Sequence, residues 1–318
     1  QCHGRGVARR RCRARVAGAP PAMTGATSAG GSCAVPKTPR VRIVSRAPVS
    51  GGHSDATKER VHVVVTDEAG EVEQIALLKR TSEAEISALR RASAVPDATA
   101  VPRVIAAGAD ADGSWVMLPF YDGRPAEDET LLPRNVLETL ARLHAHYLDR
   151  PLPGRLPVVD SGWWRAKCAV SAERLHALGR PATSALAREV TALRDEQRVV
   201  EALDTLPRTL LHGDVHRNNV LVDERGRGML VDWGGALVGA PALDIANLGG
   251  PAGDAYRTYV DTWESLTGER LGDAAWRRSR LAATVWANVK YLAFAAKVFG
   301  DDTARSMWGA ATAALAEW

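Results

Sequence analysis

The sequence predicts an α+β protein with a small, strand-rich part at about residues 41–122 and a larger helical part at about residues 123–318. Short runs of β-branched and apolar residues, separated by turns that contain Gly or Asp, recur between Val41 and Phe120. Beyond Leu131, apolar residues recur at spacings of three and four, which is typical of amphipathic helices. A chain of 318 residues is long enough for both parts.

Residues 1–40 differ in composition from the rest of the chain and are expected to form a disordered basic leader. They are rich in Arg, Gly, Ala and Pro, begin without Met although Met23 lies among them, and lack the apolar core of a signal peptide. Translation from upstream of the true start would explain such a tail. An organelle-targeting or nucleic-acid-binding arm is the alternative.

The leader also accounts for the positive net charge of +4. Ten of the 41 Lys and Arg residues and no acidic residue lie in residues 1–46, which leaves 31 basic against 37 acidic residues, a formal charge of −6. We therefore expect no nucleic-acid partner for the body. Only Cys168 lies outside the leader, so the sequence indicates no disulfide framework and fits a cytoplasmic location.

No apolar run is long enough for a membrane span. The best candidate, Leu281–Phe299, contains Asn288, Lys290 and Lys297, so it is predicted to be a buried helix. We expect no membrane partner, and the sequence indicates no particular oligomeric state.

Strands and turns alternate in the N-terminal part. The expected strands are Val41–Val44, Val61–Thr66, Ile75–Leu78, Val104–Ala109 and Trp115–Phe120. A loop of small residues at Pro48–Asp55 separates the first two strands, and Asp67–Gly70 and Asp110–Gly113 are turns. A helix at Thr81–Ser93 interrupts the series, and the segment Pro119–Gly123 leads out of it.

The rest of the chain is predicted to be mostly helical. The expected helices are Val136–Tyr147, the segment at Trp163–Trp164, Ala172–Leu178, Ala185–Leu203, Ala255–Leu266 and Ala274 to the C-terminus. His144 lies on the apolar face of the first of these helices, so we expect a core or capping histidine there rather than a catalyst.

The segment Leu210–Asn247 contains the candidate catalytic and metal-binding residues. It places Asp214 after His-Gly, Asn219 five residues later, and Asp232 beyond a predicted hairpin of Val220–Val222 and Met229–Val231. Because a hairpin brings its two ends together, Asn219 and Asp232 are expected to bind one metal ion. Phosphoryl transfer to a hydroxyl needs a carboxylate that positions and deprotonates the acceptor, here Asp214, and oxygen ligands for Mg²⁺.

These motifs resemble those of the aminoglycoside phosphotransferase and choline kinase family. The family's His-Gly-Asp-x-His-x-x-Asn loop is matched at residues 212–219, and its metal-binding Asp before an aromatic residue is matched by Asp232-Trp233. A Gly-x-Pro-x-x-Asp stretch is matched at residues 239–244. Ala240 replaces the usual acidic residue and Arg217-Asn218 the frequent Pro-Gly, but neither change affects a proposed phosphate or metal group.

The resemblance implies a bilobal, protein-kinase-like fold with an N-lobe at 41–122 that binds nucleotide and a C-lobe at 123–318 that carries catalysis and substrate binding. The implied reaction moves the γ-phosphoryl group of ATP or GTP, with Mg²⁺, to a hydroxyl of a small molecule. The acceptor would be an aminoglycoside or related antibiotic. The alternatives are a choline, homoserine or sugar kinase of the same fold, or a nucleotide-binding protein without catalysis. The His-Gly-Asp sequence argues against a protein kinase, which carries His-Arg-Asp there.

The resemblance also assigns nucleotide contacts. Lys79 at a strand end would bind the phosphates with Glu85 as its ion-pair partner, and the Gly51-Gly52 loop would lie over the phosphates. Pro119 would offer its carbonyl, and Tyr121 its amide, to the adenine edge. Four acidic residues lie where relatives bind substrate amines, but we favour solvated helix faces as their explanation. They are Asp254, Asp261, Glu264 and Asp273.

Three of these features have a second interpretation. Glu83 competes with Glu85 for Lys79, and Ser82-x-x-Glu85 is also a capping box, a role that would occupy the Glu85 carboxylate. His212-x-Asp-x-His216 could belong to a zinc site, although no further ligand set is evident. His212 could also be a buried structural group, as could Asp244, and for these two residues we favour that role.

Overall fold

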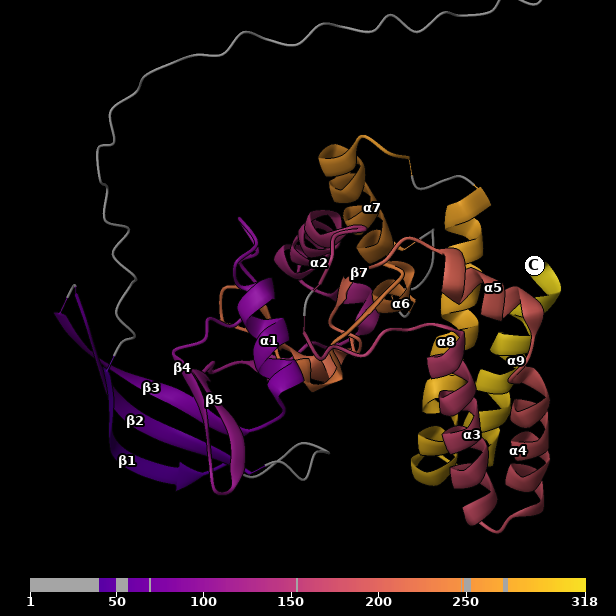
Figure 1. The fold of residues 1–318 in the computed structure, drawn as a ribbon, viewed down its shortest axis with the longest axis horizontal. Coiled ribbons are helices and arrows are strands. Elements are labelled where there is room, and N and C mark those ends of the chain that lie inside the picture. The colour runs from indigo at the N-terminus through magenta and orange to yellow at the C-terminus, as the bar shows by residue number, and fades with distance from the viewer. Residues whose placement is uncertain are drawn as a thin grey trace, which may run out of the picture. The chain divides into compact units, whose positions relative to one another are not determined.

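A five-stranded antiparallel sheet forms the N-terminal part of the chain in the computed structural model, with its strands in the order β1-β2-β3-β5-β4 (Figure 1). The strands are β1 (Arg40–Pro48), β2 (Lys58–Asp67), β3 (Gly70–Arg80), β4 (Ala106–Asp110) and β5 (Gly113–Pro119). The structure describes residues 40–49, 57–68, 70–152, 154–246, 248, 253–270 and 274–318, all within one compact unit. The predicted leader, apart from Arg40, and the Gly51-Gly52 loop lie outside the described residues.

The predicted strands form where the sequence places them, with additional residues at most ends. In β2 the alternate residues Val61 and Val63 are fully buried, as expected for a strand with one face on a core. Strand β3 pairs with β2 on one side and β5 on the other, and Lys79 lies opposite Lys58 and Val116. Lys79 therefore lies at the end of a central strand.

Helix α1 (Glu83–Ala92) follows β3 directly, in agreement with the predicted helix. Its N-cap is Ser82, whose hydroxyl accepts a hydrogen bond from the amide of Glu85 at 3.2 Å. Ile86 and Leu89 are buried in a core that also includes Val116 and Leu118 of β5. This packing fixes the position of Glu85 relative to β3.

The remainder of the described chain is largely helical. Its helices are α2 (Arg134–Tyr147), α3 (Ser161–Ala177), α4 (Pro181–Leu193), α5 (Gln197–Thr205), α6 (Ala242–Ile245), α7 (Asp254–Thr267), α8 (Ala274–Val298) and α9 (Asp301–Glu317). Helix α2 packs against α7. Helices α3, α4, α8 and α9 form a bundle in which α3 packs against α4 and α8, and α9 packs against α8 and α4 (Figure 1). No helix of the described residues is long and apolar enough to cross a membrane.

Three helix predictions are wrong in their boundaries. The segments predicted separately at Trp163–Trp164 and Ala172–Leu178 belong to one continuous helix, α3. The segment predicted as one helix at 185–203 is divided into α4 and α5, because the chain turns at Arg194–Glu196 and the Glu196 carboxylate caps α5. The segment from Ala274 onward is divided into α8 and α9 at Gly300, which has a φ of +94°. Apolar residues recur at helical spacing on both sides of each break, so apolar periodicity alone did not reveal the breaks, although Gly300 is a residue that commonly ends helices.

Short strands hold the centre of the helical part together. Strand β7 (Thr209–Leu211) pairs with β10 (Leu237–Gly239), and β6 (Arg124–Pro125), β8 (Val220–Val222) and β9 (Gly228–Leu230) form a second small sheet. The β8-β9 pair is the hairpin predicted from the sequence, in the register Val220↔Leu230. Because Leu211 pairs with Leu237, the loop that follows β7 and the turn that precedes β10 emerge side by side.

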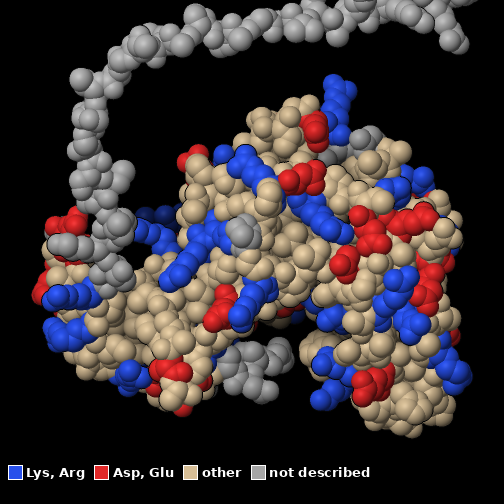
Figure 2. All heavy atoms as spheres, viewed as in Figure 1, with Lys and Arg blue, Asp and Glu red and all other residues tan. Residues whose placement is uncertain are grey.

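Three single turns of 3-10 helix complete the described elements: η1 (Glu129–Leu131), η2 (Arg217–Asn219) and η3 (Trp233–Gly235). Turn η2 ends the loop after β7, and η3 precedes β10. In the face seen in Figure 2, Lys and Arg side chains are interspersed with Asp and Glu over the helical part.

Candidate functional site

The loop after β7 is anchored by a buried carboxylate. Both oxygens of Asp244 accept backbone hydrogen bonds at 2.7 Å, one from His212 and one from Gly213. His144 lies 3.2 Å from the same carboxylate and also contacts the hydroxyl of Tyr259, so it is a core histidine, as predicted. Asp244, His144 and His212 are all buried, which supports the structural role predicted for Asp244.

His212 joins this loop to the segment before η3. Its Nε2 lies 2.9 Å from the carbonyl oxygen of Val231, and its Nδ1 accepts from the amide of Asp214 at 3.3 Å. Burial lowers the pKa of His212, which keeps the ring neutral with its proton on Nε2. Both ring nitrogens are thus occupied, and the described residues contain no group of three or more His, Cys, Asp and Glu suited to a metal. The zinc interpretation is therefore wrong for the described part of the chain.

Asp214 and Asn219 lie together within the loop. The side-chain amide of Asn219 donates to the backbone carbonyl of Asp214 at 2.9 Å and to its Oδ2 at 3.2 Å. His216 lies 3.4 Å from the same Oδ2. The Asp214 side chain is 31% exposed, so part of this carboxylate is open to a ligand.

A second group of charges connects the sheet to η3. Lys79 donates to Glu85 at 2.8 Å and to Asp232 at 2.7 Å, and the side chains of Lys79 and Glu85 are only 7% and 3% exposed. Burial favours neutral Lys79, but the carboxylates of Glu85 and Asp232 outweigh it and raise its pKa. Burial likewise opposes the charge on Asp232, but Lys79 holds its pKa below the usual range. Both groups therefore remain charged.

Glu85, and not Glu83, is the partner of Lys79. The hydroxyl of Thr81 also donates to the Glu85 carboxylate, whereas Glu83 pairs at 3.4 Å with Arg155 on the surface. Ser82 still caps the helix through the amide of Glu85. Only the serine half of the predicted capping box therefore forms, and the Glu85 carboxylate remains free for the ion pair.

The two groups of residues are joined by close backbone contacts. The amide of Val231 donates to the carbonyl of Asn219 at 2.8 Å. Gly213 has a φ of +77°, and a Cβ at that position would lie 2.1 Å from the carbonyl oxygen of Gly235. Only glycine fits there. The structure thus brings together the loop of Asp214 and Asn219 and the segment that begins at Asp232.

Helix α8 adds two residues that we did not predict for the site. The hydroxyl of Tyr291 donates to Oδ1 of Asp214, and Nζ of Lys290 lies 3.2 Å from the same oxygen. Lys290 also donates to the carbonyl of Gly213 at 2.5 Å and contacts the Tyr291 hydroxyl at 2.7 Å. A Lys-Tyr pair between the buried residues Val289 and Leu292 of α8 was the available signal, but Lys290 and Tyr291 are separated from Asp214 by 76 and 77 residues in the sequence.

These contacts determine the charge states around Asp214. Burial alone would raise the pKa of Asp214, but the hydrogen bond from His216, the charge of Lys290 and the hydroxyl of Tyr291 together hold it well below its usual range. Burial raises the pKa of Tyr291, and the neighbouring Asp214 raises it further. At neutral pH Asp214 is therefore an anion, and Tyr291 is a protonated donor to it.

The segment after β5 is arranged as an edge that a ligand could bind. The amide of Phe120 donates to the carbonyl of Ile75 at 3.1 Å, so the pair Ala76↔Pro119 is a non-hydrogen-bonded pair and the Pro119 carbonyl points away from β3. No hydrogen bond between described residues uses the amide of Tyr121.

Of the acidic residues considered for substrate amines, Asp254 pairs with Arg257 of its own helix, Asp261 is exposed on α7, and Asp273 lies outside the described residues.

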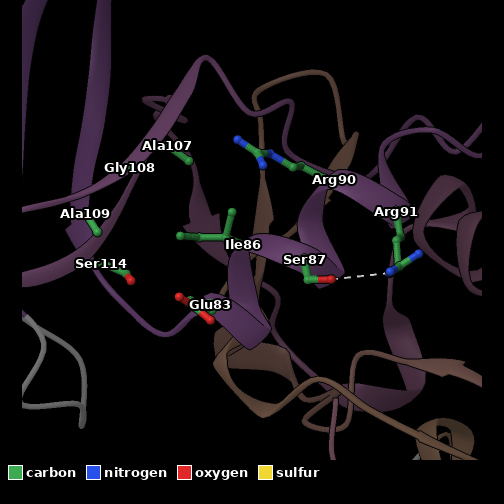
Figure 3. Close-up of a pocket in the computed structure, with 9 residues that line it drawn as sticks. All are labelled: Glu83, Ile86, Ser87, Arg90, Arg91, Ala107, Gly108, Ala109 and Ser114. Atoms are coloured by element: carbon green, nitrogen blue, oxygen red, sulfur yellow. Dashed lines mark hydrogen bonds between the residues drawn. The ribbon is translucent and has the colours of Figure 1, made fainter. Parts of the chain in front are cut away.

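A separate pocket of about 480 Å³ lies between α1 and the β4-β5 hairpin (Figure 3). Glu83, Ile86, Ser87 and Arg90 of α1 line it together with residues 107–109 and Ser114. Glu85 does not line this pocket, nor does Lys79. The pocket is therefore distinct from the charged groups described above.

Comparison with known proteins shows which family model the sequence matches and which solved structures share its fold. The sequence matches the model of the phosphotransferase enzyme family over residues 46–289. No curated protein matches it significantly. Among solved structures, it is similar to a putative fructosamine-3-kinase from Thermobifida fusca YX-ER1, with 17% identity, coverage of 86% of this chain and 94% of that chain, and a TM-score of 0.54.

Two further structures give comparable results. Choline kinase LicA from Streptococcus pneumoniae is 12% identical, with 87% and 94% coverage and a TM-score of 0.53. A thermostable mutant of aminoglycoside phosphotransferase APH(4)-Ia, in ternary complex with AMP-PNP and hygromycin B, is 18% identical, with 86% and 93% coverage and a TM-score of 0.50. Identities this low establish a shared protein-kinase-like fold and no shared substrate.

Proposed function

Because the chain belongs to the phosphotransferase enzyme family and has a bilobal protein-kinase-like fold, we propose that it transfers the γ-phosphoryl group of ATP or GTP to a hydroxyl of a small molecule. The observation that carries this proposal is that two groups lie next to each other: the Asp214–Asn219 pair, and Lys79 with the carboxylates of Glu85 and Asp232 on either side of it. The AMP-PNP in the structure of the aminoglycoside phosphotransferase supports a nucleotide co-substrate.

In the proposed reaction, Asp214 accepts a hydrogen bond from the acceptor hydroxyl and receives its proton. The acceptor oxygen forms a bond to the γ-phosphorus, the bond from that phosphorus to the β,γ-bridging oxygen breaks, and ADP or GDP leaves. Lys79 binds the nucleotide phosphates, and Glu85 holds Lys79 in position. The Pro119 carbonyl and Tyr121 amide bind the edge of the base.

Asn219 and Asp232 would hold Mg²⁺, and their chemistry fits that ion. No hydrogen bond between described residues uses Oδ1 of Asn219 or Oδ2 of Asp232, so a carboxamide oxygen and a carboxylate oxygen remain available. Hard oxygen ligands of this kind suit Mg²⁺. When bound, the ion would neutralise charge on the phosphate oxygens.

We propose that the N-lobe spans residues 41–122 and the C-lobe 123–318, that residues 1–40 form a separate leader, and that the protein is cytoplasmic. An aminoglycoside or related antibiotic is the first acceptor class to test, followed by choline, homoserine and sugars. The similar structures include an aminoglycoside phosphotransferase, a choline kinase and a putative fructosamine-3-kinase, so the fold does not distinguish between these acceptors.

The test is turnover of Mg-ATP and Mg-GTP by the full chain, with a panel of hydroxylated amines, sugars and antibiotics. Positioned base catalysis contributes about 10²–10⁴ in rate, so Asp214→Ala should lose at least about 100-fold in turnover while ATP affinity stays within a few-fold. Asp195→Ala is the matched control, because Asp195 is an exposed carboxylate that pairs with Arg165 and Arg194. Undiminished turnover by Asp214→Ala would reject the assignment. Nucleotide binding without turnover by the unmodified protein would favour a non-catalytic binder.

A further inference from the structure

The carboxylate of Asp214 is shared between two sets of donors. Its Oδ2 faces Asn219 at 3.2 Å and His216 at 3.4 Å, both from the same loop. Its Oδ1 faces α8, where it accepts from the Tyr291 hydroxyl and lies 3.2 Å from Nζ of Lys290. The loop itself therefore leaves Oδ1 for an external donor, and a hydroxyl group already occupies that position.

We propose that the Tyr291 hydroxyl substitutes for the acceptor: it occupies the hydrogen-bonding position on Asp214 that the acceptor hydroxyl takes during the reaction. While no acceptor is bound, Tyr291 keeps water away from Oδ1 and so prevents wasteful hydrolysis of the nucleotide. A bound acceptor displaces the phenol and takes over its hydrogen bond. This inference rests on the proposed function, because it assumes that Asp214 receives the acceptor proton.

The surroundings of Tyr291 allow the side chain to move without its helix. Helix α8 packs against α3, α6 and α9, and both Val289 and Leu292 beside the Lys-Tyr pair are fully buried. The backbone is therefore fixed. Tyr291 as a residue is only partly buried, so a rotation about its side-chain bonds can withdraw the hydroxyl from Asp214.

Lys290 would remain in place when Tyr291 moves. It donates to the carbonyl of Gly213 at 2.5 Å, and its ammonium lies 5.0 Å from the ring centre of Trp286. Withdrawal of Tyr291 removes one of its hydrogen-bond partners, at 2.7 Å. An oxygen of the acceptor can take that bond. The sequence of α8 contains no Asp or Glu, so this side of Asp214 suits an acceptor with a neutral or anionic oxygen next to its hydroxyl.

The experiment is ADP release from Mg-ATP by the full chain without any acceptor. In this side reaction the oxygen of water bonds to the γ-phosphorus, the bond to the bridging oxygen breaks, and Asp214 receives the proton. Tyr291→Phe removes only the hydroxyl, so it should raise acceptor-free hydrolysis by about tenfold or more. This factor is the ratio between molecules with Oδ1 occupied and molecules with Oδ1 free for water that one hydrogen bond to a charged group maintains. Tyr291→Met, which also lacks the hydroxyl, should show the same increase.

The control is Tyr256→Phe on α7, which removes a hydroxyl bonded to Trp276 and leaves Asp214 untouched, so hydrolysis should stay within about twofold of the unmodified protein. A purely structural role for Tyr291 would make hydrolysis fall or leave it unchanged, and either result overturns the inference alone.

Mass spectrometry of the unmodified protein after incubation with Mg-ATP gives a second measurement. Phosphate on Tyr291 would show that it is an acceptor itself and would also overturn the inference. If neither the unmodified protein nor any variant releases ADP with or without acceptors, the proposed function fails and the inference fails with it.

Discussion

The ion pair between Lys79 and Glu85 supports a quantitative prediction. The change is Glu85→Gln, which keeps the size of the side chain and removes its charge. In the structure this carboxylate accepts from Lys79 at 2.8 Å through one oxygen and from the Thr81 hydroxyl through the other. A glutamine has one oxygen, so it can accept from only one of these donors, and its amide group faces the other.

The expected cost follows from burial. Lys79 is 7% exposed and cannot turn to water, so it loses a hydrogen bond to a charged partner, which is worth about 1.5–3 kcal/mol. Removing one partner of an isolated buried pair costs about 3–5 kcal/mol. Lys79 keeps Asp232 at 2.7 Å, so the lower range applies and we expect a loss of about 2 kcal/mol.

Urea unfolding measures this loss. With a slope of about 3 kcal/mol per molar urea, the midpoint should fall by about 0.7 M. Nucleotide affinity, measured by calorimetry, should fall as well, because Lys79 is then held only by Asp232. Glu83→Gln is the matched control on the same helical turn. Its pair with Arg155 is exposed, so it should change the midpoint little. Equal midpoints for the two variants would refute the reasoning.

Two further predictions concern the loop of Asp214. Gly213→Ala should destabilise the protein and reduce turnover far more than Gly226→Ala. Both glycines have a left-handed φ, of +77° and +73°, but only at Gly213 would a Cβ meet backbone, 2.1 Å from the carbonyl oxygen of Gly235. Equal unfolding midpoints for the two variants would contradict this prediction. His212 has a pKa below that of a free histidine because it is buried, so the unfolded chain binds more protons and the free energy of unfolding should fall as pH drops through about 6.5. Urea titrations at pH 7.5 and 5.5 measure how much the free energy of unfolding decreases between these values. His212→Gln should make this decrease smaller by about 1 kcal/mol, whereas the control His176→Gln, at an exposed residue, should leave it unchanged.

Much of the fold could be predicted because its signals are local. Valine alternation around Val61 predicted β2, and the turn at 223–226 between two apolar runs predicted the β8-β9 hairpin. The same hairpin brought Asn219 next to Val231, as expected from its position at the hairpin end. Helix breaks were missed because the caps at Glu196 and Gly300 interrupt sequences that otherwise favour helix.

The remaining features of the site depend on contacts between distant parts of the chain. The choice between Glu83 and Glu85 required the direction of each side chain on α1, which the packing of Ile86 and Leu89 determines. The approach of Lys290 and Tyr291 to Asp214 depends on how α8 packs in the bundle, and no spacing in the sequence encodes it. Tertiary packing rather than local propensity fixes both arrangements.

The charge state of Asp214 bears on the proposed chemistry. Its depressed pKa makes it a weak base, yet a phosphoryl group that passes through a loose transition state needs little help from a strong base early in the reaction. Position then matters more than basicity. Asn219 and His216 on one oxygen, with Lys290 on the other, hold the carboxylate in one orientation even after an acceptor has displaced Tyr291. These donors lower the basicity of Asp214 and at the same time fix its direction, so the arrangement favours an acceptor hydroxyl that arrives in one geometry over water, which can arrive in many.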